Sequence, residues 1–208
     1  MQKRTETFAG SRPVYTGSPA VEIGGFNLDE SQHVPVGAVI PAGTLCVHNE
    51  ATRSVKLVKT GKVKAIDSTK KKITLESDEF LCPIFAVGDK IAKAAGGTYA
   101  DAITITAISD TNDAYVITMS GTITGLAVGD IIGEVVADGA NSAFIPGAGI
   151  IATPRLVKEN METTLAVSLN TLQWSVFKRR VLPIMDSQLD ATGSVLANNH
   201  NIRFTNAF

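Results

Sequence analysis

Short apolar runs, each bounded by glycine, proline or small polar residues, succeed one another along most of this chain. The first two runs are Val36–Ile40 and Thr44–Val47, and Pro41-Ala42-Gly43 lies between them. Proline fixes φ at about −65° and glycine tolerates positive φ, so this tripeptide predicts a tight turn between two strands. Residues Ser54–Lys59 then alternate in part between apolar and polar, which predicts a further strand with one buried face.

A weak internal repeat occupies residues 61–139, which carry the same order of motifs twice. Each unit has a strand, a turn of Asp, Ser and Thr, a second strand, and a Val-Gly-Asp turn before a third strand. The first unit runs from Ala65 to Ile91 and the second from Ala107 to Ile132. Asp and Ser side chains bond to their own backbone at turns, and glycine supplies positive φ. We therefore expect two three-stranded units that close on each other as a small barrel or sandwich.

The last part of the chain returns to short strands after a break rich in Gly, Ala, Pro and Ser at residues 138–149. Strands are expected at Gly149–Ala152 and Leu165–Leu172, with a final short one at Ile202–Phe204. Residues Ile184–Asn199 are the best helix candidate, because apolar positions are spread along them, although a glycine in this stretch weakens a helix.

Residues 1–25 differ from the rest of the chain, because their apolar side chains are few and scattered. We interpret them as an extended arm that becomes ordered where it finds a partner. Their Thr- and Val-containing sequence suits addition to a partner's sheet, and their cations add charge pairing with an acidic surface. A leader without a role is the alternative.

Composition and charge exclude several classes of function. The chain of 208 residues has 19 Lys+Arg against 20 Asp+Glu, so its net charge of −1 gives no general attraction to nucleic acid or anionic membranes. Two cysteines, Cys46 and Cys82, are too few for a disulfide scaffold, lack zinc-ligand spacing and are expected in the core. No apolar run is long enough to span a membrane, and the N-terminus lacks the apolar part of a signal peptide. We expect folding in a reducing cytoplasm.

The sequence predicts no catalytic residue, no cofactor and no metal site. Residues Gly147–Ala152 match the G-x-G-x-x-A pattern of dinucleotide sites, but Thr153-Pro154 comes next, where such a site needs a helix to begin. The three histidines lack metal-ligand spacing. Residues Asp110–Asp113 offer carboxylates without the rest of a calcium loop, and they predict a hairpin turn.

A basic tract is the one charge feature that needs explaining. It consists of Arg53, Lys56, Lys59, Lys62, Lys64, Lys70, Lys71 and Lys72. Such a tract suits nucleic acid or another acidic surface. Because it contains no aromatic residue on which a base could stack, protection of an exposed strand edge by lysines explains it better.

The order of these pieces resembles the head decoration and head fibre proteins of tailed phages and prophages. Three segments carry the resemblance: Val36–Leu45 (VGAVIPAGTL), Ile145–Ala152 (IPGAGIIA) and Trp174–Pro183 (WSVFKRRVLP). The expected closing helix and Asn201–Phe204 complete it. The resemblance covers about residues 34–59 and 138–208, and residues 61–139 depart from the family's pattern.

Together, the patterns and the resemblance imply a mainly β fold. It would be a small β-barrel or tulip-like decoration domain with one C-terminal helix, interrupted by an inserted all-β domain. The expected parts are an arm over residues 1–25, the decoration-like domain over 26–60 plus 138–208, and the insert over 61–137. The family implies a non-enzymatic virion structural protein, made in the bacterial cytoplasm, that binds the major capsid protein on the outer capsid surface, often as a homotrimer.

Two groups of residues are candidates for these contacts. The capsid contact is assigned to arm residues Lys3, Arg4, Phe8, Val14 and Tyr15. The oligomer interface is assigned to the large apolar side chains Trp174, Phe177, Phe204 and Phe208. A nucleic-acid-binding β-barrel that uses the basic tract, and a carbohydrate-binding or adhesive β module, are the alternatives.

Overall fold

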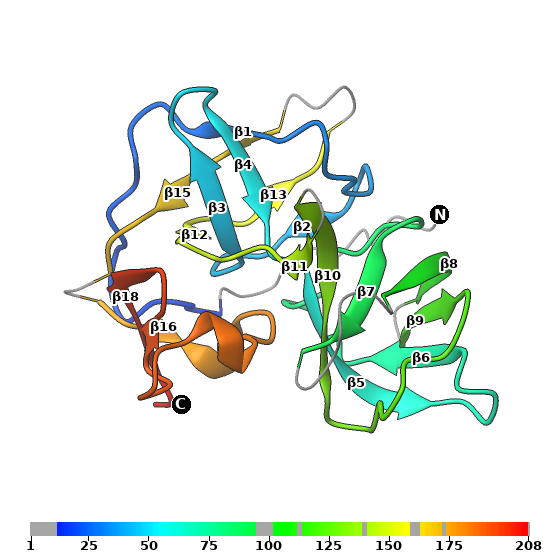
Figure 1. The fold of residues 1–208 in the computed structure, drawn as a ribbon. Coiled ribbons are helices and arrows are strands. Elements are labelled where there is room, and N and C mark those ends of the chain that lie inside the picture. Colours follow the sequence, from blue (N-terminus) through cyan, green and yellow to red (C-terminus); the bar gives the residue numbers. More distant parts are fainter. Residues whose placement is uncertain are drawn as a thin grey trace.

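Strands and turns make up almost all of the structure, a computed structural model that describes residues 12–94, 102–111, 114–138, 141–158, 163–171 and 174–207. Figure 1 shows two β bodies side by side, with a small C-terminal sheet next to the first. The prediction of a mainly β fold is confirmed. Within the described ranges, no helix is long and apolar enough to cross a membrane.

A six-stranded sheet forms the first β body. Its strand order is β14 (Thr164–Leu165), β1 (Phe26–Leu28), β4 (Ser54–Leu57), β3 (Leu45–Asn49), β12 (Gly149–Ile151) and β15 (Val167–Ser168). Strands β3 and β4 form a hairpin whose turn is shaped by Asn49, since its side-chain oxygen accepts hydrogen bonds from the N–H groups of Ala51 and Thr52. Alternate side chains such as Leu28 and Leu57 fill the core of this body.

A two-stranded ribbon lies beside this sheet, and its first strand ends at the first predicted turn. It pairs β2 (Val39–Ile40) with β13 (Arg155–Leu156). After β2 the chain turns at Pro41, whose carbonyl oxygen accepts a hydrogen bond from Thr44 Oγ1 at 2.7 Å. Gly43 has a φ of +78°, which an L side chain rarely adopts. The predicted tight turn at Pro41-Ala42-Gly43 is therefore confirmed.

The second body is a closed barrel built from both repeat units. The order of its seven-stranded sheet is β11 (Asn141–Phe144), β10 (Ile131–Asp138), β5 (Thr60–Ile66), β6 (Lys72–Leu75), β9 (Ala114–Met119), β8 (Ile103–Thr111) and β7 (Lys90–Lys93). Because β10 also pairs with β7, the six strands from β10 to β7 close on themselves. Each repeat unit contributes three of them, and the apolar side chains of both, such as Val63 and Ile105, share one core.

The two Val-Gly-Asp turns of the barrel have the same structure. In each turn the aspartate carboxylate accepts a hydrogen bond of 2.7 Å from the N–H of the alanine three residues before it, for Asp89 and for Asp130 alike. Gly88 and Gly129 have φ values of +98° and +92°. The repeat in the sequence therefore corresponds to a repeated turn in the structure.

The C-terminal region forms a three-stranded sheet, and the helix expected at Ile184–Asn199 is wrong. The elements are β16 (Val176–Phe177), β18 (Asn199–Thr205) and β17 (Val195–Leu196), with the 3₁₀ turns η3 (Lys178–Arg180) and η4 (Asp186–Gln188) between β16 and β17. Asp190 explains the difference, because its carboxylate accepts hydrogen bonds from backbone N–H groups within a tight turn in which Gly193 has a φ of +68°. The final strand expected at Ile202–Phe204 lies within β18.

One apolar cluster joins all three parts. It combines Leu45 and Val58 of the first body, Ala92 and Val135 of the barrel, and side chains of the C-terminal sheet such as Phe204. The cluster is thus shared between the predicted decoration-like domain and the predicted insert. The barrel is packed against the rest of the chain as well as being connected to it.

Candidate functional site

The described part of the predicted arm packs on the chain's own body. Val14 lies against the shared apolar cluster, and the Tyr15 hydroxyl donates a 2.6 Å hydrogen bond to the carbonyl of Ile151. Burial raises the pKa of the Tyr15 phenol above its ordinary value. The other three residues assigned to the capsid contact, Lys3, Arg4 and Phe8, lie outside the described residues.

The residues assigned to an oligomer interface have different surroundings. Phe204 is buried in the shared cluster, and Phe177 lies under the guanidinium of Arg180 at 4.4 Å from its ring centre. Trp174 keeps 41% of its surface exposed, whereas Phe208 lies outside the described residues. The pairing of β16 with β18 places Phe204 opposite Val176 and Phe177 opposite Thr205, so the two phenylalanines lie on opposite faces of this sheet. Trp174 therefore offers the largest exposed apolar area of the three that are described.

The basic tract is spread over several surroundings rather than one surface. Arg53 donates hydrogen bonds to the carbonyl groups of Ile23 and Gly25, and Lys62 pairs with Glu76 at 2.9 Å. Lys59 is buried. Lys56, in β4, lies 3.9 Å from Asp29. The other four, Lys64, Lys70, Lys71 and Lys72, are exposed in and around the β5–β6 hairpin. The tract predicted from the sequence is therefore not one continuous basic surface, and its exposed group is these four lysines of the barrel.

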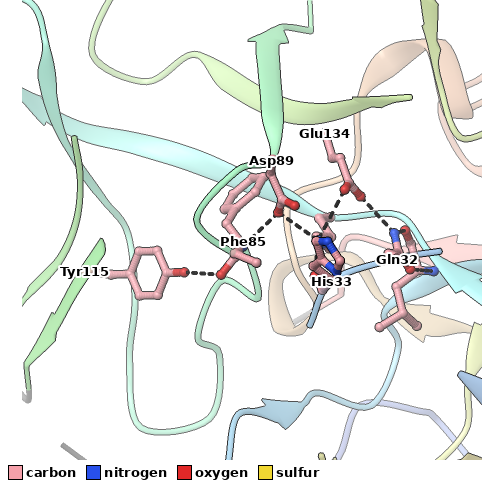
Figure 2. Close-up of polar contacts among 9 residues, drawn as sticks. Gln32, His33, Phe85, Asp89, Tyr115 and Glu134 are labelled. Atoms are coloured by element: carbon pink, nitrogen blue, oxygen red, sulfur yellow. Dashed lines mark hydrogen bonds and ion pairs between the residues drawn. The ribbon is translucent and has the colours of Figure 1, made fainter. Parts of the chain in front are cut away.

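Three charged side chains are buried together where the first body meets the barrel. The ammonium of Lys59 lies 2.7 Å from Asp89 Oδ2 and 3.2 Å from Glu134 Oε1. It also donates a hydrogen bond to the carbonyl oxygen of His33. Figure 2 shows Asp89 and Glu134 pointing toward the same place. We call Lys59, Asp89 and Glu134 the Lys59 cluster; their side chains are 0%, 4% and 9% exposed.

Neighbouring groups hold the Lys59 cluster in place. The Gln32 amide nitrogen donates to Glu134 Oε2 at 2.8 Å, and the Glu134 N–H donates to the carbonyl oxygen of Lys59 at 3.0 Å. Burial raises the pKa of the Glu134 carboxyl above its ordinary value, the charge of Lys59 opposes this, and the charge of Asp89 raises the pKa further. Because the cluster is closed to solvent and internally bonded, it is suited to holding the two bodies together.

The internal repeat explains why this cluster needs Lys59. Lys93 and Glu134 occupy equivalent positions, each four residues after a turn aspartate. Lys93 pairs with Asp130 of the other unit at 2.8 Å. The corresponding contact between the units places Glu134 of the second unit near Asp89 of the first. These two carboxylates would repel each other without the cation of Lys59 between them. Sequence reasoning missed the cluster, although aligning the two units reveals an acid where the first unit has a lysine.

A groove of about 810 Å³ opens between the loop His33–Val39 and the barrel. We call it the loop–barrel groove. Its barrel wall includes residues 79–80, 82–87 and 108–111 together with Tyr115. The Tyr115 hydroxyl donates a 3.2 Å hydrogen bond to the carbonyl of Phe85, which ties that wall to the barrel (Figure 2). Sequence reasoning missed the groove as well, because its walls come from distant segments whose approach depends on the packing of two bodies.

The two cysteines should differ sharply in reactivity. Cys46 is fully buried, and burial raises the pKa of its thiol, whereas Cys82 is half-buried on the groove wall. Since the thiolate is the reactive form, we expect a disulfide reagent to modify one thiol in the folded protein and the second after unfolding. Absorbance titration with and without guanidinium measures this. Cys82→Ser should abolish the native-state reaction, and its persistence in that variant would contradict the assignment.

Within the described residues, no group of three or more His, Cys, Asp or Glu side chains is placed to hold a metal ion. Comparisons of the chain with protein-family models, with curated proteins and with solved structures found no match. Function is therefore inferred from the chain's own sequence and geometry.

Proposed function

We propose that the chain is a non-enzymatic virion structural protein that binds the major capsid protein on the outer surface of a phage or prophage capsid, as a decoration or head fibre protein. The observation that carries this proposal is the meeting of the three sequence segments that resemble that family. They are far apart in the chain, and their direct contacts meet at Gly43, where the first body adjoins the C-terminal region.

The contacts among these segments are backbone hydrogen bonds and close packing. The Gly43 N–H donates to the carbonyl of Ile151 at 2.7 Å, and the Ile151 N–H donates to the carbonyl of Thr44 at 2.9 Å. The third segment contributes Val181, which packs so closely on Gly43 that an added Cβ would lie 2.2 Å from it. If the three segments belong to one shared fold, they should pack together although they are distant in the sequence. Their contacts at Gly43 meet this expectation and support the resemblance.

The described part of the arm reaches the same place. Tyr15 bonds to the carbonyl of Ile151, and Val14 lies beside Gly43. The segment preceding Arg12 is thereby attached at an anchored point on the body, which suits an arm that contacts a shell. Three such arms on a homotrimer would bind one shell site with raised avidity.

The charged residues also favour a structural role over catalysis. The buried titratable groups of the Lys59 cluster are closed to solvent and bonded to one another. A reacting group needs access to a substrate, whereas a closed ionic cluster fixes the relative position of two bodies.

Co-sedimentation with purified shells of the phage that encodes the chain tests the proposal. The full chain should sediment with the shells, and nuclease-treated, DNA-free shells should bind it equally well. To test the arm, residues 1–11 should be removed so that the truncated chain starts at Arg12. A truncated chain that starts near Gly25 would lack Val14 and Tyr15, which pack on the body. Failure of the full chain to bind shells, together with salt-dependent binding to duplex DNA, would favour the nucleic-acid alternative instead.

A further inference from the structure

The loop–barrel groove presents apolar side chains to solvent along both of its walls. Val36 and Val39 on the loop wall are 49% and 37% exposed, and Val87 on the barrel wall is 56% exposed. Leu156, 51% exposed, continues the loop wall, because it is the ribbon partner of Val39. Apolar side chains gathered along a groove are typical of a surface that another molecule covers.

The charge of the groove is one-sided. Glu79 contributes an exposed carboxyl group on the barrel wall, and the carboxylate of Asp110, also on that wall, accepts a hydrogen bond from Cys82 Sγ at 3.7 Å. No lysine or arginine is among the described residues that line the groove. The rim already holds a guanidinium: Arg12 pairs with Asp78 at 2.9 Å and lies 5.8 Å from the centre of the Phe80 ring. A ligand with a cation beside apolar side chains would complement both the apolar surface and the negative charge of this groove.

The groove is also preformed. The loop wall is fixed to the ribbon, because the Gly37 N–H donates to Val157 and the Val157 N–H donates to Ala38, at 2.9 and 2.8 Å. The ammonium of Lys59 also donates a hydrogen bond to the carbonyl oxygen of His33, which fixes the start of the same loop. A groove whose two walls are held in place loses little conformational entropy when a ligand binds.

We propose that the loop–barrel groove binds an extended peptide segment of the capsid shell protein, in which a lysine or arginine stands beside apolar side chains. The identity of the partner rests on the proposed function. The apolar residues of the segment lie against Val36, Val39 and Val87, and its cation faces the exposed carboxylate of Glu79. An extended chain adds about 3.3 Å per residue, so a few residues span a groove of this size.

The internal repeat supplies a matched pair of variants for the test. Val87 and Val128 are equivalent residues of the two Val-Gly-Asp turns and are 56% and 65% exposed, but Val87 lines the groove and Val128 does not. The probe is a fluorescent eight-residue peptide that alternates Val and Lys, with a control peptide in which Glu replaces Lys. Fluorescence anisotropy should show the Lys peptide binding at least tenfold more tightly than the Glu peptide.

Val87→Ser, which removes apolar surface without adding charge, should weaken binding of the Lys peptide at least tenfold, and Val128→Ser should leave it unchanged. Equal binding by the two variants, or no preference for the Lys peptide, overturns the inference. Tighter peptide binding by a chain that starts at Arg12 would also overturn it, because residues 1–11 would then be the occupant.

Shell binding separates this inference from the proposed function. We expect Val87→Ser to sediment with shells less than Val128→Ser does. Full shell binding by Val87→Ser would overturn the groove as the contact and leave the proposed function intact. If the unaltered chain does not bind shells, the proposed function fails, whatever the peptide result.

Discussion

Replacing Lys59 by methionine should destabilise the protein by about 3–5 kcal/mol at neutral pH, since removal of one partner leaves the others as uncompensated buried charges. The side chain of Lys59 is 0% exposed, and its ammonium is the cation that separates Asp89 from Glu134. Methionine fills a similar space but cannot neutralise either carboxylate. Urea unfolding followed by tryptophan fluorescence measures the change in the free energy of unfolding.

Lys62→Met is the matched control for this variant. Lys62 lies in β5, close to Lys59 in the sequence, but its ion pair with Glu76 has side chains 42% and 50% exposed. An exposed pair of this kind contributes about 0–1 kcal/mol, so the control should unfold almost like the unaltered protein. Similar losses in both variants would contradict a special role for the buried cluster.

The effect of Lys59→Met should also depend on pH. The pKa of Glu134 is already raised in the folded protein by burial and by Asp89, and loss of Lys59 removes the charge that opposes this rise. A carboxyl with a raised folded pKa stabilises the fold fully below its unfolded pKa, and this contribution is lost as the pH rises through the folded pKa. The difference between Lys59→Met and the unaltered protein should therefore narrow as the pH falls from 7 toward the ordinary glutamate value of 4.5. A constant difference would contradict this.

Replacing Gly43 by alanine should be costly for two reasons that add. Its φ of +78° disfavours any L side chain by about 1–2 kcal/mol. An added Cβ would also lie 2.2 Å from Val181 and 2.9 Å from Val14, and forced overpacking costs about 1–3 kcal/mol more. We expect a total loss of about 2–5 kcal/mol in the free energy of unfolding.

Gly37→Ala isolates the backbone part of this effect. Gly37 has a φ of +83°, close to that of Gly43, but nothing lies within 4 Å of an added Cβ. Its replacement should cost only the backbone strain of about 1–2 kcal/mol. Equal losses in the two variants would show that the packing of Val14 and Val181 on Gly43 adds nothing.

Features set by neighbours in the sequence were predictable, and features set by distant residues were not. The turn at Pro41-Ala42-Gly43 and the paired Val-Gly-Asp turns result from local backbone chemistry. The helix at Ile184–Asn199 failed because the apolar pattern there does not record what Asp190 does to the backbone. The groove and the Lys59 cluster depend on how two bodies pack, which no local pattern records.

The packing of the arm on the body was also not predictable from the local sequence. Few apolar residues predicted an arm without a core of its own, yet Val14 and Tyr15 pack on the body, and backbone hydrogen bonds such as that from the Phe177 N–H to the carbonyl of Val14 attach the arm further. The average hydrophobicity of the segment records neither these bonds nor the two packed side chains.

The hydrogen bond between Glu134 and Lys59 joins the two segments by which the chain enters and leaves the barrel, and this has a mechanical consequence. The chain enters the barrel just after Lys59 and runs out of it along β10, and the Glu134 N–H joins the two paths through the carbonyl of Lys59 at 3.0 Å. Because β5 and β10 are antiparallel and the chain enters and leaves at the same end of the pair, a pull on the two flanking segments loads this bond and the adjacent ion pair first, in an unzipping direction. Once they break, we expect the pairs between β5 and β10 to open one after another and the barrel to unfold.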